Sequence, residues 1–108
     1  MYELRHYVDA AGNDLFARWL ESLKDRGARL KIAVRLVRVA NGNFGDTKHV
    51  GSGVWELRVH SGPGYRIYYA IEREKVVLLC HGGDKSSQNV DVKEAIGRWN
   101  DWKRRGTQ

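Results

Sequence analysis

Residues 53–85 constrain the fold more than any other part of this chain. The first stretch alternates apolar with polar side chains, which is typical of a strand with one buried face: Trp55, Leu57 and Val59 against Glu56, Arg58 and His60. The Ser-Gly-Pro-Gly sequence at 61–64 favours a tight turn, because glycine adopts positive φ freely and proline fixes its own φ. A second alternating stretch spans 65–72, and an almost wholly apolar one spans 75–81. The segment therefore predicts three consecutive antiparallel strands.

The N-terminal part predicts one more strand and the first of two adjacent helices. Residues 2–8 alternate, which indicates a short strand at the sheet edge or paired with a later strand. Apolar residues recur at helical spacing through 14–26, so a helix is expected there with Asn13 as its N-cap. Gly27 is expected to end this helix, and Ala28 to begin the next one. So short a connection predicts an αα-hairpin.

The second helix has two distinct sides. Its apolar side, expected to face the core, carries Leu30, Ala33, Val34 and Val37. Its other side carries Arg29, Lys31, Arg35 and Arg38, which is typical of a solvated helix face and, as an alternative, of a surface that contacts phosphates. Residues 41–52 have the composition of a loop.

A C-terminal helix completes the expected fold. Apolar residues recur at helical spacing after the capping residues at 86–89, and they include Trp99, expected in the core, and Trp102, whose place is open. The predicted class is α+β in one domain over residues 1–108. A small antiparallel sheet, made of the N-terminal strand and the three-strand meander, carries the αα-hairpin on one face and adds the C-terminal helix.

Composition limits the environment and the partners. The chain has 108 residues, which suits one domain, and a net charge of +6, which favours polyanions such as nucleic acid or, equally, an acidic protein. The single cysteine, Cys80, is expected in the core, consistent with a reducing cytoplasm. No apolar run is long enough for a membrane span. The four histidines are scattered without metal-ligand spacing, so neither a metal nor a cofactor is predicted.

The polar face of the predicted sheet gathers charge. Glu56 and Arg58 point the same way along their strand, and Arg66 and Tyr68 share that face across the turn. Lys85 follows the last strand, while Lys48 and His49 precede the first strand of the meander. A cross-strand ion-pair ladder explains these residues, and spacing alone favours it.

The same residues also suit phosphoryl transfer on RNA. Attack by a ribose 2′-hydroxyl builds negative charge on the phosphate oxygens, and a guanidinium can pair with two of them. Arg66 is the first candidate for this role, with Arg58 and Lys85 as further cations. His49 is the first candidate for proton transfer because an unperturbed imidazole titrates near pH ~6.5. Glu56, Tyr68 and His81 are alternatives for that step.

Several motifs, in order along the chain, resemble one family. The motif carriers are Asn43-Phe44-Gly45-Asp46, Lys48, Val50-Gly51, Val54, Glu56-Leu57-Arg58, Gly62-Pro63-Gly64-Tyr65-Arg66-Ile67-Tyr68-Tyr69, Leu78-Leu79-Cys80 and Gly82-Gly83-Asp84-Lys85-Ser86-Ser87-Gln88. Together they resemble the RelE/ParE superfamily of toxins from type II toxin–antitoxin systems, in its phage-derived, HigB-like addiction-module killer branch. The resemblance implies a small antiparallel sheet with an αα-hairpin on one face and a basic surface on the other.

The resemblance also implies an activity and partners. Ribonuclease members cleave mRNA in the ribosomal A site without a metal, so it implies an endoribonuclease (mRNA interferase) that inhibits translation and arrests growth. Arg66 matches the strand arginine of the family's GYR motif, and Lys85 matches a second basic position. Lys48, Arg58 and Tyr68 are the further expected RNA contacts. A cognate antitoxin, commonly a helix-turn-helix protein, is the implied protein partner.

Two departures from the family pattern keep alternatives open. Glu56 stands where ribonuclease members have a lysine, and no tyrosine lies near Asp91 to match the C-terminal tyrosine of some members. The same fold hosts ParE-like toxins that inhibit DNA gyrase without cleaving RNA. A non-catalytic gyrase inhibitor and an inert protein-binding module are therefore the alternative functions.

Overall fold

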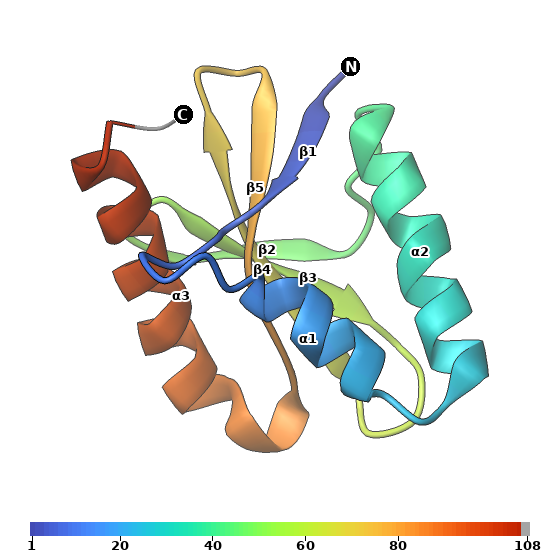
Figure 1. The fold of residues 1–108 in the computed structure, drawn as a ribbon. Helices are drawn as coiled ribbons and strands as arrows, with labels where there is room; N and C mark the ends of the chain where they lie inside the picture. Colours follow the sequence, from blue (N-terminus) through green and yellow to red (C-terminus); the bar gives the residue numbers. More distant parts are fainter. Residues whose placement is uncertain (107–108) are drawn as a thin grey trace.

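A mixed five-stranded sheet forms the centre of the protein. The structure is a computed structural model that describes residues 1–106 (Figure 1). The strands lie in the order β1-β5-β4-β3-β2, in which β1 runs parallel to β5 and every other pair is antiparallel. Their bounds are Glu3–His6 (β1), Thr47–Gly51 (β2), Val54–Val59 (β3), Tyr65–Glu72 (β4) and Val76–Asp84 (β5).

The predicted α+β class and the β3-β4-β5 meander are confirmed, with two differences in the sheet. The sheet is mixed rather than antiparallel throughout, because β1 pairs in parallel with β5 at the edge. A fifth strand, β2, occupies part of the predicted loop and pairs with β3. Lys48 and His49 in its centre are both exposed, so the strand lacks the apolar alternation that would have predicted it.

Three helices cover the two faces of the sheet. Helix α1 (Leu15–Ser22) and helix α2 (Arg26–Ala40) lie over one face, and helix α3 (Gln88–Arg104) lies over the other (Figure 1). A short 3₁₀ turn, η1 (Lys85–Ser87), joins β5 to α3. No helix within residues 1–106 is long and apolar enough to cross a membrane.

The boundaries of the first two helices differ from the predicted ones because aspartates cap them. The Asp14 side chain accepts a hydrogen bond from the Ala17 amide at 2.9 Å, so Asp14 rather than Asn13 is the N-cap of α1. Asp25 accepts from the Ala28 amide at 3.1 Å and caps α2. Gly27 therefore lies in the first turn of α2 instead of ending α1.

Each face of the sheet has its own core. Beneath α1 and α2, Phe16 and Ile32 pack against the inward side chains of β3, β4 and β5. Beneath α3, Trp99 and Trp102 are both buried and pack with Tyr7, Tyr68 and the apolar part of β5. Trp99 is thus a core residue as predicted. Trp102, whose place the sequence left open, is a core residue too.

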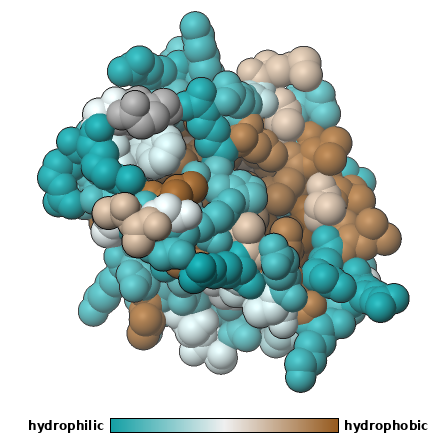
Figure 2. Space-filling view, viewed as in Figure 1, coloured by the Kyte–Doolittle hydropathy of each residue, from teal (hydrophilic) through white to brown (hydrophobic). Residues whose placement is uncertain are grey.

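The orientation of α2 is the reverse of the predicted one. Leu30, Val34 and Val37 face solvent, with 67%, 43% and 62% of their surface exposed, while the buried residues of α2 are Ala28, Ile32 and Val39. Figure 2 shows a hydrophobic area over α2, bordered by hydrophilic side chains. Leu36 packs on the same side as these buried residues, and Arg35 donates hydrogen bonds to the carbonyls of Arg58 and Phe44 at 2.5 and 3.0 Å.

Candidate nucleic-acid interface

The turn between β3 and β4 forms one wall of an open basic hollow of about 560 Å³. We call it the turn hollow, and its lining residues are His60, Ser61, Gly62, Pro63, Gly64, Arg66 and Lys85. Gly62 and Gly64 have φ values of 50° and 80°, which glycine adopts without strain, and the Gly64 amide donates to the Ser61 carbonyl at 3.0 Å. The predicted Arg66 and Lys85 therefore line the same space.

Glu56 lies buried beside this hollow and holds both arginines. Its side chain is fully buried, and its Oε2 atom lies 3.1 Å from Nε of Arg58 and 3.6 Å from a terminal nitrogen of Arg66. The Gln88 amide donates to its Oε1 atom at 2.7 Å. A buried carboxylate needs such partners to remain charged. Glu56 therefore holds the guanidiniums of Arg58 and Arg66 in place.

The sheet register explains why a carboxylate is needed there. Arg58 lies directly opposite Arg66 in the β3–β4 ladder, and like charges so placed repel each other. Glu56 offsets one of the two positive charges. Arg58 keeps 31% of its side chain exposed, and Arg66 keeps 13%, with its buried Nε atom lacking a hydrogen-bond partner. The ion pairs expected from spacing exist, and a terminal nitrogen of Arg58 also lies 3.7 Å from Asp46.

Tyr68 lies beneath the surface rather than on it. Its ring and hydroxyl are buried, and the hydroxyl donates to Glu56 at 3.5 Å. Burial, followed by the charges of Glu56 and Asp91, raises the pKa of Tyr68 far above its ordinary value. The hydroxyl therefore remains protonated at neutral pH.

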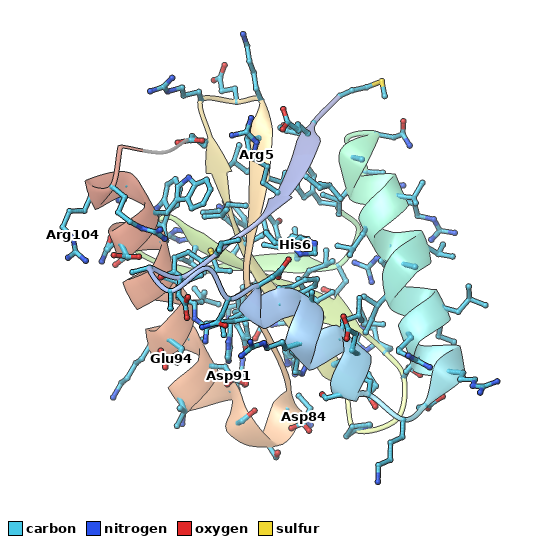
Figure 3. The ribbon with its side chains drawn as sticks, in the orientation of Figure 1. Arg5, His6, Asp84, Asp91, Glu94 and Arg104 are labelled. Carbon is cyan, nitrogen blue, oxygen red and sulfur yellow. The ribbon has the colours of Figure 1, made fainter. Side chains whose placement is uncertain are left out.

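A second polar cluster fixes the start of α3 to β5. Nε2 of His81 lies 2.7 Å from Asp91, Ser87 donates to the other Asp91 oxygen at 2.5 Å, and Arg98 lies 2.7 Å from Nδ1 of His81. Figure 3 shows Asp91 projecting from α3 toward the sheet, at the same end of the molecule as Asp84. This cluster places Gln88 where it reaches Glu56, so it positions the arginines indirectly.

The sequence did not single out this second cluster, although one signal was present. A Cβ atom added to Gly83 would lie 1.9 Å from the Asp91 carboxylate, and one added to Gly82 would lie 2.1 Å from the Trp19 ring. In the sequence the Gly82-Gly83 pair appears as part of the motif that follows the last strand. It marks a place where α1 and α3 approach the two faces of β5 closely.

The structure places Lys48 and His49 in a different hollow from Arg66 and Lys85. This β2 hollow has a volume of about 570 Å³ and is lined by Lys48, His49, Val50, Asn89, Val92 and Lys93. Lys48 lies directly opposite Glu56 in the β2–β3 register, on the side away from β4. Arg58, Arg66 and Lys85 thus form one group, and Lys48 and His49 form another across Glu56.

His60 is a histidine at the turn hollow that the sequence did not single out. Its Nε2 atom lies 2.6 Å from Asp46, and its side chain is 76% exposed. The hydrogen bond from His60, together with the charge of Arg58, lowers the pKa of Asp46 below its ordinary value. An exposed imidazole held by a carboxylate at the edge of a basic hollow can exchange protons with a bound ligand.

The fold and these surfaces define a small basic α+β protein with a group of cations at the β3–β4 turn. The model of the family described as "Phage derived protein Gp49-like (DUF891)" matches residues 18–96, well over half of the chain, and the protein belongs to this family. An uncharacterized protein of Haemophilus influenzae is 46% identical over 80 residues, which cover 74% of this chain and 81% of the relative. Every residue of both hollows lies within the matched range.

Proposed function

We propose that this protein is the toxin of a type II toxin–antitoxin module and that it inhibits translation by cleaving mRNA on the ribosome. The observation that carries the proposal is the pair of arginines anchored by buried Glu56, with Lys85 across the open turn hollow. Membership of the Gp49-like phage-derived family is compatible with it. The motif resemblance to RelE- and HigB-like toxins supplies the reaction.

The proposed chemistry uses Arg66 and Lys85 of the turn hollow together with Arg58, which shares Glu56 with Arg66. The 2′-hydroxyl oxygen gives its proton to a base and forms a bond to phosphorus, while the bond to the 5′-oxygen breaks and that oxygen takes up a proton, which leaves a 2′,3′-cyclic phosphate and a 5′-hydroxyl. Charge on the nonbridging oxygens is stabilised by the guanidinium of Arg66, with Arg58 and Lys85 as additional cations. Glu56 acts as a positioning residue, because its carboxylate fixes both guanidiniums before RNA arrives.

Two histidines compete for the role of proton acceptor. His60 lines the turn hollow itself, whereas His49 lines the β2 hollow on the other side of Glu56. Comparing His60→Ala with His49→Ala assigns the role, because loss of the acceptor should reduce cleavage by about 10²–10⁴-fold.

A translation reaction tests the proposed function. Purified protein should produce mRNA breaks at positions aligned with codons, and Arg66→Ala should abolish them. Arg104→Ala is the matched control, because Arg104 is a largely exposed arginine near the end of α3 and its loss should leave cleavage intact. Intact mRNA with the unaltered protein would contradict the proposal.

A non-catalytic gyrase inhibitor is the second candidate, and one observation favours it. Glu56 offsets part of the arginine charge at a position where the resemblance implies a lysine. A supercoiling assay separates the two functions: gyrase inhibition with intact mRNA supports the second candidate. An inert binding module would leave growth unaffected on expression. For either toxin, co-expression of the protein encoded by the adjacent reading frame, the proposed antitoxin, should restore growth.

A further inference from the structure

An unpartnered apolar stripe runs along the solvent side of α2. Leu30, Val34 and Val37 are spaced four and three residues apart, so they form one continuous row on the helix. Single exposed aliphatic residues are ordinary on a protein surface, whereas a row of three on one helix face is typical of a contact surface.

Two residues of the stripe, Leu30 and Val34, line an open, shallow groove, and Val37 continues the row beyond it. The groove has a volume of about 450 Å³, and we call it the α2 groove. It lies between α2 and the end of β3, and its lining residues are Leu30, Lys31, Val34, Arg35, Arg38, Val59 and His60. Its apolar floor can receive aliphatic side chains, and its basic rim can pair with carboxylates.

The charge of α2 is of one sign. The helix contains no aspartate or glutamate and carries five basic residues: Arg26, Arg29, Lys31, Arg35 and Arg38. Arg35 is used inside the protein by its bonds to backbone carbonyls, whereas Lys31 and Arg38 are exposed beside the apolar stripe. A ligand that complements this surface has apolar residues in a row and acidic residues on both sides of that row.

We infer that the α2 groove binds an acidic amphipathic helix of another protein. A second copy of this chain fits poorly, because a symmetric contact through α2 would set the same cations against each other. Single-stranded RNA gains most from aromatic stacking, and the α2 groove contains no aromatic ring of Phe, Tyr or Trp.

The α2 groove is separate from the turn hollow, so the inference does not depend on RNA cleavage. The two spaces share one lining residue, His60, at the end of β3. A helix seated in the groove would therefore end beside the turn hollow, and its carboxylates would compete there with phosphate groups. Binding of the acidic helix and binding of RNA should weaken each other.

A binding titration with a synthetic peptide tests the inference. The probe is a helix of about five turns, with leucines spaced like Leu30, Val34 and Val37 and glutamates on both flanks. The control peptide has the same composition with the leucines scattered around the helix. The intact protein should bind the first peptide at least about tenfold more tightly than the second.

Two valines supply matched variants of the protein. Val34 on α2, which lines the groove, and Val90 on α3 are both helical and exposed, at 43% and 67%, so Val34→Glu and Val90→Glu add the same charge to two helix surfaces. Val34→Glu should weaken peptide binding by about tenfold or more, and Val90→Glu should leave it unchanged. Equal thermal unfolding of the two variants verifies that both are folded.

Four results would overturn the inference. They are equal binding of the two peptides, equal binding by the two variants, Val34-dependent binding to vesicles of anionic phospholipid instead of the peptide, and Val34-dependent dimerisation in sedimentation instead of peptide binding. The mRNA assay separates this inference from the proposed function. If the protein cleaves mRNA but does not bind the peptide, only the inference about the groove is overturned. If it binds the peptide but leaves mRNA intact, only the proposed ribonuclease activity is overturned.

Discussion

The two faces of the sheet are packed with different chemistry. The face under α1 and α2 is filled by apolar and aromatic side chains such as Phe16, Ile32 and Ile67. The face under α3 also has an apolar part, but toward the turn hollow it contains Glu56 and Asp91, the buried charged residues among those the structure describes. The first face supplies stability, and the second additionally fixes the positions of charged side chains. The predictions below test whether these roles can be separated.

The largest expected effect lies on the apolar face. Phe16 is almost fully buried against the sheet, so Phe16→Ala should lower the free energy of unfolding by about 3–5 kcal/mol through lost burial and a cavity. Chemical denaturation measures this loss. The protein that remains folded should cleave RNA at the usual rate, because Phe16 does not line the turn hollow. Loss of cleavage per folded molecule would break the separation of roles.

Glycine substitutions on β5 test the close approach of α3. Gly83→Ala places a methyl group 1.9 Å from the Asp91 oxygen that accepts a hydrogen bond from Ser87. The substitution should lower the free energy of unfolding by about 3 kcal/mol and displace Glu56 and its two arginines. Gly97 in α3 has no neighbouring atom within 4 Å of an added Cβ, so Gly97→Ala should stabilise the helix by up to about 1 kcal/mol. Equal melting temperatures for the two variants would contradict the account.

Glu56→Ala tests whether the polar face positions the charged side chains. It removes the shared partner of Arg58 and Arg66 and should destabilise the protein by about 2 kcal/mol. This cost lies below that of Phe16→Ala because both guanidiniums can still reach water. Cleavage should fall more than stability explains, since the arginines lose their fixed positions. Cleavage at the wild-type rate, measured by 5′-end mapping, would show that Glu56 does not position them.

The smallest effect concerns acid sensitivity at the other end of α3. Tyr7 donates to Asp101 at 2.6 Å, and this bond is the main cause that lowers the pKa of Asp101 below 3.8 in the folded protein. A lowered folded-state pKa stabilises the protein above the unfolded value, and this stabilisation is lost as pH falls through the folded value. Tyr7→Phe should therefore flatten the loss of stability below about pH 4, as followed by denaturation at several pH values. An unchanged slope would contradict this role of the bond.

Local patterning predicted much of the fold and less of the site. Alternation located β3, β4 and β5, because each strand has one face that must be buried. Helix α2 carries a second apolar row, Ile32, Leu36 and Val39, and this row rather than the predicted one faces the core. Periodicity identifies both rows but does not show which of them the sheet covers.

The sequence predicted the cations of the candidate site but not the buried contacts that hold them in place. Arg66 and Lys85 were named together, and they line one hollow. Glu56 was expected on an open polar face, whereas the covering helix α3 buries it and brings Gln88 to it. That contact joins positions 32 residues apart in sequence, so no local pattern predicts it.

The central proposal is that this protein cleaves mRNA in a translating ribosome and that the guanidinium of Arg66, held by Glu56, stabilises the charge that develops on the phosphate. The most direct measurement maps 5′ ends of mRNA in a translation reaction that contains the unaltered protein or Arg66→Lys. The account predicts codon-aligned breaks with the unaltered protein and a loss of at least about tenfold with Arg66→Lys, because an ammonium keeps the charge but cannot pair with two oxygens. Intact mRNA with the unaltered protein, or equal cleavage by both, would contradict it.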